Sequence, residues 1–292
     1  MCVFFFSGCR VKVPKTVTEM NSNPDLYVIC LANSFASRGA ATLAFLHREI
    51  PADQRGSIVR FNAVTPADFV LQDVASASQV AIIRGKAPRV THNDMSDSKQ
   101  VACYLSHKAL WQVCADSGKP IVVVEDDARP SNMAGRIQQA LSAHSELANA
   151  ASQRGEPEVP LVVLLQNGST SFLTNHDVGS AFAVKYFTGT SAYYVTPSAA
   201  RLLFTRSPLA EMHVDRFMPT CIAAYDLAVY AVPGSADQST ADSTLMHSSD
   251  WDIVTERQQL VTWMLAGVVI ALFIWAVTAQ VCLSMGRVRR VL

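Results

Sequence analysis

The sequence has 292 residues, of which 50% are hydrophobic, and its 24 acidic and 24 basic residues give a formal net charge of zero. A chain of this length and apolar content can bury a sizeable core, which excludes disorder as its main state. The charge balance offers no overall field for binding nucleic acid. The seven cysteines include no C-x-x-C pair, so reduced thiols are favoured over a zinc knuckle or a disulfide framework.

Strands and helices alternate along the first half of the chain. Residues 1–24 form an extension that ends in the turn-rich "NSNPD", and residues 25–250 form the folded domain. The apolar patterns predict strands at 26–31, 57–61, 79–84 and 120–124, and helices at 34–50 and 96–118. Ser34 or Ser37 is expected to cap the first helix, which Pro51 stops; a serine is expected to cap the second, which ends at Gly118.

The second half continues this alternation. A helix is predicted over 131–150 and another over 197–206, where a proline opens the first turn, and strands are predicted over 161–165, 181–187 and 191–195. Strands that alternate with helices predict an α/β fold with a mostly parallel sheet flanked by helices.

The stretch 260–285 carries no charge. At about 1.5 Å per residue it is longer than the hydrocarbon core of a bilayer, about 30 Å, so it predicts one C-terminal transmembrane helix. Residues 251–259 would be a juxtamembrane linker and 286–292 a basic tail. The arginines of that tail favour a cytosolic tail and a domain on the other side of the membrane, but the N-terminus lacks a clear secretory signal. A tail-anchored protein with a cytosolic domain therefore stays open.

Three acidic residues, Glu125, Asp126 and Asp127, directly follow the buried strand 120–124. In open α/β sheets, ligands collect beyond the carboxyl ends of the strands. A divalent cation such as Mg²⁺ or Mn²⁺ would offset the repulsion between these carboxylates. If the strand persists, Glu125 and Asp127 point to one side and Asp126 to the other. The alternative is a simple turn whose aspartates favour the start of the next helix.

These residues also carry a family resemblance. "VACYLSHKALW" followed by "GKPIVVVEDDA" resembles glycosyltransferase family 25, which contains lipopolysaccharide and procollagen galactosyltransferases and has a pattern of roughly G-C-x-x-S-H … V-x-E-D-D-A. "VICLANSFASRGA", "RFNAV", "GTSAYYVTPSAARLL", "HVDRF" and "VYAVPGSADQST" are similar to further elements of the family in the same order. Ala102 and His213 depart from it, since glycine and proline are usual there, and the membrane segment is not a general family feature.

The resemblance implies a GT-A-like fold that uses a UDP-sugar and a divalent metal, Mn²⁺ or Mg²⁺. The roles it implies are metal ligands at Asp127, Glu125 and His247, donor-binding residues at Arg38, Ser106, His107, Glu125 and Asp126, and a catalytic base at Asp215.

Structural alternatives stand beside three of these roles. Asp215 could pair with Arg216 or cap a helix, and His107 could be a buried histidine with satisfied hydrogen bonds. Trp111, Tyr193 and Tyr194 are expected in the core, because aromatic residues in regular elements usually pack there.

The leading hypothesis is a membrane-anchored, inverting glycosyltransferase. It would move a hexose such as galactose from a UDP-sugar to a glycan or protein acceptor with the help of a metal. The alternatives are a non-catalytic binding or scaffold protein of the same fold at a membrane and, third, a metal-dependent hydrolase.

Overall fold

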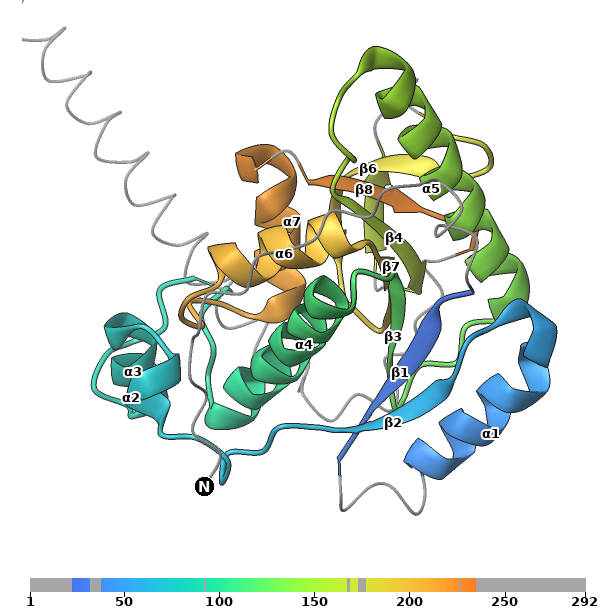
Figure 1. The fold of residues 1–292 in the computed structure, drawn as a ribbon. Coiled ribbons are helices and arrows are strands. Elements are labelled where there is room, and N and C mark those ends of the chain that lie inside the picture. The colour runs from blue at the N-terminus through green and yellow to red at the C-terminus, as the bar shows by residue number, and fades with distance from the viewer. Residues whose placement is uncertain are drawn as a thin grey trace, which may run out of the picture.

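A computed structural model describes residues 23–31, 38–91, 93–166, 169–172, 177–225 and 227–234. Its strands are β1 (Asp25–Cys30), β2 (Ile58–Asn62), β3 (Ile121–Glu125), β4 (Leu161–Gln166), β5 (Ser169–Phe172), β6 (Phe182–Thr188), β7 (Ala192–Val195) and β8 (Ala228–Ala231). They form one eight-stranded sheet in the order β2-β1-β3-β7-β4-β8-β6-β5 (Figure 1).

The sheet is mixed, but most of its strands run in one direction. β1 pairs in parallel with β2 and β3, and β4 pairs in parallel with β8. β7 is antiparallel to both β3 and β4, and β6 is antiparallel to both β8 and β5. Each reversal is undone by the next, so every strand except β6 and β7 points the same way. The predicted α/β fold is confirmed, whereas the two reversed strands were not expected.

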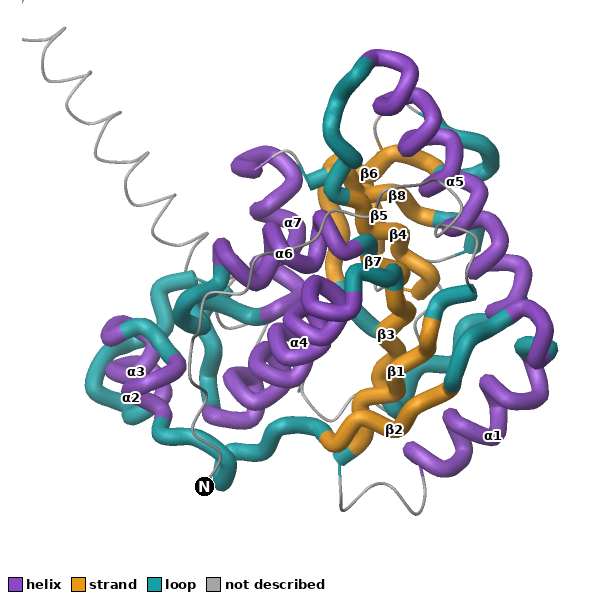
Figure 2. Tube along the Cα trace, in the orientation of Figure 1, coloured by secondary structure: helices purple, strands orange, loops and turns teal. Residues whose placement is uncertain are grey.

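Helices cover both faces of the sheet. They are α1 (Ala40–Glu49), α2 (Leu71–Val74), α3 (Ala77–Ile83), α4 (Ser98–Ser117), α5 (Met133–Arg154), α6 (Pro197–Arg206) and α7 (Val214–Tyr225), with a 3₁₀ turn, η3, at Ala52–Gln54. Helices α1 and α5 lie on one face, and α4, α6 and α7 lie on the other (Figures 1 and 2). Two cores result, one on each side of the sheet.

β3 belongs to both cores. Val122 and Val124 pack in the core under α1 and α5, while Ile121 and Val123 pack in the core under α4. This alternation explains the unbroken apolar run, because a strand covered on both faces has no solvent side. The aromatic residues expected in the core, Trp111, Tyr193 and Tyr194, are all fully buried.

The strand predicted at 79–84 is wrong. These residues lie mostly in α3, whose N-cap is Ser76; its hydroxyl accepts a hydrogen bond from the backbone N–H of Gln79 at 3.4 Å. A short apolar run has no decisive period, and the cap decided between helix and strand. Gln79 is itself buried and bonds to the carboxylate of Asp94 at 3.1 Å and to the backbone N–H of Met95 at 2.9 Å.

The cap expected at the start of the second helix is also different. Asp97, not a serine, caps α4, and its Oδ1 accepts hydrogen bonds from the N–H groups of Lys99 at 2.8 Å and Gln100 at 3.0 Å. The predicted end is confirmed, because Gly118 has the left-handed conformation, with φ +67°, that glycine adopts most readily. Ser34 and Ser37 lie outside the described residues.

Several predicted segments also lie outside the described residues: most of the extension 1–24, the linker 251–259, the span 260–285 and the tail 286–292. In the part of the chain that the structure describes, none of the helices has the length and apolar character needed to cross a bilayer.

Candidate active site

The site lies where β3 ends. Glu125 is the last residue of the strand, and Asp126 and Asp127 form the turn that follows. Because β7 runs antiparallel to β3, the loop that precedes β7 lies beside this end: the Glu125 N–H donates to the carbonyl of Ser191 at 2.8 Å. The reversal of β7 therefore brings the loop between β6 and β7 to the three carboxylates.

Arg38 lies directly before α1 and contacts two of these carboxylates. Its guanidinium is 3.1 Å from Asp126 and 3.9 Å from Asp127. On the same side, the hydroxyl of Thr42 in α1 donates to the backbone carbonyl of Asp126 at 2.7 Å. The Arg38 that sequence reasoning assigned to the donor is thus held at the acidic turn, with 22% of its side chain exposed.

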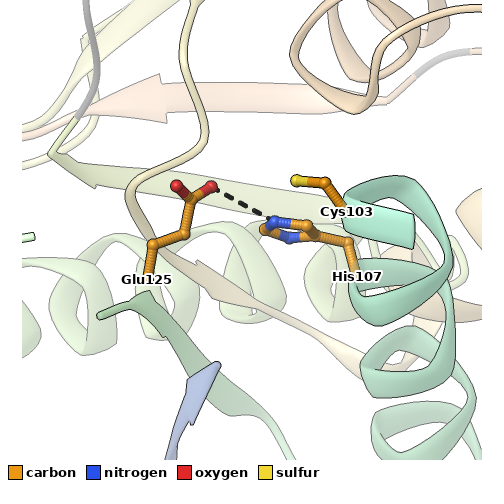
Figure 3. A group of neighbouring side chains, drawn as sticks. All are labelled: Cys103, His107 and Glu125. Atoms are coloured by element: carbon orange, nitrogen blue, oxygen red, sulfur yellow. Dashed lines mark hydrogen bonds and ion pairs between the residues drawn. The ribbon is translucent and has the colours of Figure 1, made fainter. Parts of the chain in front are cut away.

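Glu125 points to the opposite face, toward α4. Its Oε1 accepts a hydrogen bond from the hydroxyl of Thr190 at 3.2 Å and lies 3.2 Å from Nε2 of His107 (Figure 3). Asp126, by contrast, faces α1. Burial, and then the charge of Asp126, raise the pKa of Cys30, a thiol of the core under α1 and α5. The predicted separation of Glu125 from Asp126 is therefore present in the structure.

The charged form of Asp127 is disfavoured by its surroundings. Burial, and then the charge of Glu125, raise its pKa to about 6, although Arg38 acts in the other direction. Its Oδ1 is buried and has no hydrogen-bond partner among the residues that the structure describes. A buried carboxylate oxygen without a partner, next to a second carboxylate, fits a divalent cation, since both are hard oxygen ligands.

His107 is fully buried and belongs to a chain of hydrogen bonds. The indole N–H of Trp111 donates to the hydroxyl of Tyr193 at 3.0 Å, and that hydroxyl lies 2.9 Å from Nδ1 of His107. If Nδ1 of a neutral ring accepts from the Tyr193 hydroxyl, Nε2 carries the ring proton and donates it to Glu125. The contacts of His107 fit the structural alternative, a buried histidine with satisfied hydrogen bonds. The same contacts hold Glu125 in place.

Ser106 lies next to His107 but faces away from the carboxylates. Its hydroxyl donates to the carbonyl of Ala102 at 2.9 Å and accepts from the N–H of Val64 at 2.9 Å. Ser106 therefore fastens the segment after β2 to α4. Ala102, where the family usually has glycine, is buried and takes part through this carbonyl.

Asp215 lies in the first turn of α7 and belongs electrostatically to the same site. Burial and the charge of Glu125 raise the pKa of Asp215 to about 6, while a hydrogen bond from the backbone N–H of Gly189 partly lowers it. Gly189 has φ +77°, which favours glycine at this position of the loop before β7. The neighbouring Arg216 lies over the ring of Tyr186, at 5.8 Å from its centre.

His213 occupies the position where proline is usual. Its N–H donates to the carbonyl of Asn93 at 3.3 Å, a bond that proline could not make. Burial, and then the nearby Arg89, lower the pKa of its imidazole to about 4, so the ring is neutral at pH 7. The substitution therefore ties the start of α7 to the segment before α4. The remaining predicted ligand, His247, lies outside the described residues.

Three residues of this site were missed by sequence reasoning: Thr42, Gly189 and Thr190. Two of them open the quoted segment "GTSAYYV", whose similarity to the family was noted without a role. Its tyrosine, Tyr193, was expected in the core and is also the partner of His107. The signal was present for the loop before β7, whereas nothing in the sequence pointed to Thr42.

The thiol of Cys103 lies beside His107 and Glu125 (Figure 3). Among the described residues it is a free cysteine, as are Cys30, Cys114 and Cys221. Burial, and the charges of Glu125, Asp215 and Asp127, raise the pKa of Cys103 well above its ordinary value. Cys103 is therefore a neutral thiol at pH 7 in the absence of a cation.

The fold is that of an α/β protein with a cluster of carboxylates at the end of parallel strands. A family model described as glycosyltransferase family 25 (LPS biosynthesis protein) matches residues 24–218. The chain belongs to glycosyltransferase family 25, as its motifs predicted. A search of curated proteins gives no match. Membership implies glycosyltransferase activity, with a sugar donor and an acceptor as substrates.

Proposed function

We propose that the protein is a metal-assisted, inverting glycosyltransferase that takes a hexose from a UDP-sugar and is anchored in a membrane by residues 260–285. Galactose is the sugar suggested by the family resemblance, and the acceptor is a glycan or a protein. The observation that carries the proposal is the acidic cluster, in which Glu125 acts on both Asp127 and Asp215 and each of those two has a pKa of about 6.

The donor's diphosphate is the group that this cluster would bind through a cation. Asp127 and Glu125 are the ligands that the described residues offer, because Oδ1 of Asp127 lacks a partner and Oε1 alone of Glu125 makes the bonds to His107 and Thr190. A bound Mn²⁺ or Mg²⁺ would neutralise the negative charge that grows on the leaving diphosphate. Arg38 would balance the remaining charge of Asp126 and Asp127.

Asp215 is the proposed base. An inverting transferase needs a carboxylate to take the proton of the acceptor hydroxyl as the new glycosidic bond forms. A carboxylate with a pKa near 6 is a stronger base than an ordinary aspartate and is still ionised at neutral pH. Asp127 would thus bind the cation while Asp215 acts as the base, and this combination favours sugar transfer over the binding-only alternative.

The test for the donor site uses the full chain in mild detergent. UDP binding should be at least tenfold tighter with Mn²⁺ than with a chelator, measured by calorimetry, and Asp127→Asn should remove most of this difference, because a neutral amide is a poorer ligand for the cation. Asp116→Asn, an exposed acid near the end of α4, is the control and should behave as the wild type. Metal-dependent UDP binding retained by Asp127→Asn would contradict the metal assignment.

A panel of labelled UDP-sugars separates the three functional hypotheses. Transfer to an added acceptor supports the glycosyltransferase, release of free sugar without transfer supports a hydrolase, and neither outcome supports a binding or scaffold protein. The same panel identifies the donor sugar.

A further inference from the structure

Cys103 and His107 lie four residues apart on α4, so their side chains share one face of the helix. Both point toward Glu125 at the end of β3 (Figure 3). The thiol sulfur, an imidazole nitrogen and a carboxylate oxygen of these residues all lie within 4.8 Å of one another. Cysteine, histidine and glutamate are ligand types that zinc accepts, and three protein ligands leave a fourth position open for water.

We propose that Cys103, His107 and Glu125 form a second metal site, specific for thiophilic divalent cations such as Zn²⁺, whose occupation inhibits the enzyme. The site is separate in chemistry from the one proposed at Asp127, since thiolate and imidazole select softer cations and carboxylates alone suit Mn²⁺ and Mg²⁺. The inhibition rests on the proposed function, because it follows from the capture of Glu125 by the softer cation. The metal site itself does not depend on that function.

The surrounding charges favour a cation at this place. Burial, and then the charges of Glu125, Asp215 and Asp127, disfavour a lone thiolate at Cys103. A dication between thiolate and carboxylate would reverse the sign of these charge interactions. Cys103 is only partly buried as a residue. His107, which is fully buried, would hold the ion from the protein side.

Binding has a defined proton balance. The Cys103 thiol releases its proton to solvent and its sulfur binds the metal as thiolate. The proton of the His107 ring moves from Nε2 to Nδ1, which frees Nε2 for the metal. Nδ1–H then donates to the oxygen of Tyr193, which lies 2.9 Å away, and the hydrogen of the Tyr193 hydroxyl turns away from Nδ1. Glu125 exchanges its hydrogen bond from His107 for the cation and keeps that from Thr190.

Co²⁺ is the probe that reports on the ligands directly. Added to the metal-free full chain in detergent, it should give the near-ultraviolet charge-transfer absorption of a cobalt–thiolate bond. Cys103→Ser should abolish this band, and Glu125→Gln should weaken Co²⁺ binding by about tenfold or more. Cys221→Ala, which changes a cysteine of α7 outside the cluster, and Asp127→Asn should both keep the band.

A second measurement needs no variant. Zn²⁺ should slow alkylation of Cys103 in the wild-type chain at least tenfold, as measured by mass spectrometry of the labelled peptide, and should leave the labelling of Cys221 after denaturation unchanged. The absence of a thiolate band in the wild type, a band that persists in Cys103→Ser, or alkylation of Cys103 that is indifferent to Zn²⁺ would each overturn the proposal.

The inhibitory part is tested on transfer with saturating Mn²⁺. Micromolar Zn²⁺ should lower the rate of the wild type and of Cys221→Ala, and Cys103→Ser should be at least tenfold less sensitive. If the wild type shows no transfer under any condition, the proposed function fails while the cobalt spectrum still decides the metal site. Equal Zn²⁺ inhibition of Cys103→Ser and wild type would overturn the inhibitory role.

Discussion

Asp127 and Asp215 are each held in the fold with a pKa of about 6, against an ordinary value of 3.8. A raised carboxyl pKa means that the native state binds an extra proton between these two values. The free energy of unfolding therefore falls as the pH rises from about 4 to about 6, and the loss persists at neutral pH. Two pKa units correspond to up to about 3 kcal/mol for each group. These two carboxylates therefore lower the free energy of unfolding at neutral pH, as expected where charged groups are concentrated for function.

The variant Asp215→Asn distinguishes the effect of Asp215 on stability from its effect on sugar transfer. Transfer should fall by about a hundredfold or more, because the amide cannot accept the acceptor's proton, while metal-dependent UDP binding stays within about threefold of the wild type. Without metal or nucleotide at pH 7.5, the variant should be as stable as the wild type or more stable, by up to about 3 kcal/mol, and the advantage should vanish below pH 4. Urea unfolding and rate measurements check the two effects.

A variant that keeps wild-type transfer would remove Asp215 from the mechanism. A variant that loses both stability and transfer would instead support the structural alternative, in which Asp215 serves the first turn of α7.

At single positions, the sequence allowed the acidic residues to be predicted better than their partners. Glu125 and Asp127 could be identified because three carboxylates after a buried apolar run are unusual. Strand alternation separated Glu125 from Asp126, but it does not extend to Asp127, because β3 ends at Glu125. The contact of Arg38 with Asp126 could not be predicted, because it joins residues 88 positions apart whose distance depends on the pairing of β1 with β3. The bond between Tyr193 and His107 depends in the same way on β7.

Helix α4 carries Cys103, Ser106 and His107, so its first turn matters for the site. Asp97→Ala should lower the free energy of unfolding by about 1 kcal/mol, because the N–H groups of Lys99 and Gln100 lose their acceptor. Asp97→Ser should restore most of the loss, since serine is also a good cap. Thermal and urea unfolding give the values.

The matched control for this prediction is Asp116→Ala, at the other end of the same helix. An acid near a helix C-terminus opposes the helix dipole, so its removal should change stability by no more than about 0.5 kcal/mol, toward higher stability. An equal loss in both variants would contradict the prediction, because the loss at Asp97 would then not be specific to the helix cap.

Strand β7 is fixed on both faces by equivalent contacts. Tyr193 bonds to His107 of α4, whose other nitrogen meets Glu125, and Tyr194 bonds at 2.7 Å to His144 of α5, whose other nitrogen meets Glu158 at 3.1 Å. Consecutive residues of a strand point to opposite faces, so one dipeptide joins the sheet to both helix layers. The apolar pattern of "SAYYV" predicted the strand, but its reversed direction follows from pairing partners distant in sequence and was not readable.

For the molecule as a whole, the alternation of strands and helices was sufficient to predict the α/β class, because each apolar strand needs helices on both faces to bury it. The order of the strands in the sheet could not be predicted from this alternation. After β5 and β6 at the edge of the sheet, the chain returns to the interior, where β8 lies between β4 and β6. No local sequence pattern predicts this return. The acidic turn lies at the end of β3, next to the reversed strand, where the regular parallel packing stops.

The last prediction concerns the segment 260–285, whose uncharged length would cross a bilayer. The full chain should sediment with membranes, resist extraction by high salt and alkaline carbonate, and be released by detergent, because the anchoring is apolar and not electrostatic. A chain ending at residue 259 should move to the supernatant and keep its Mn²⁺-dependent UDP binding, as the described part of the site lies before residue 235. As a control, Arg287→Gln, Arg289→Gln and Arg290→Gln together should leave the sedimentation unchanged, since these residues would set orientation and not insertion. Release of the full chain by salt or carbonate alone would mean that the segment does not span the membrane.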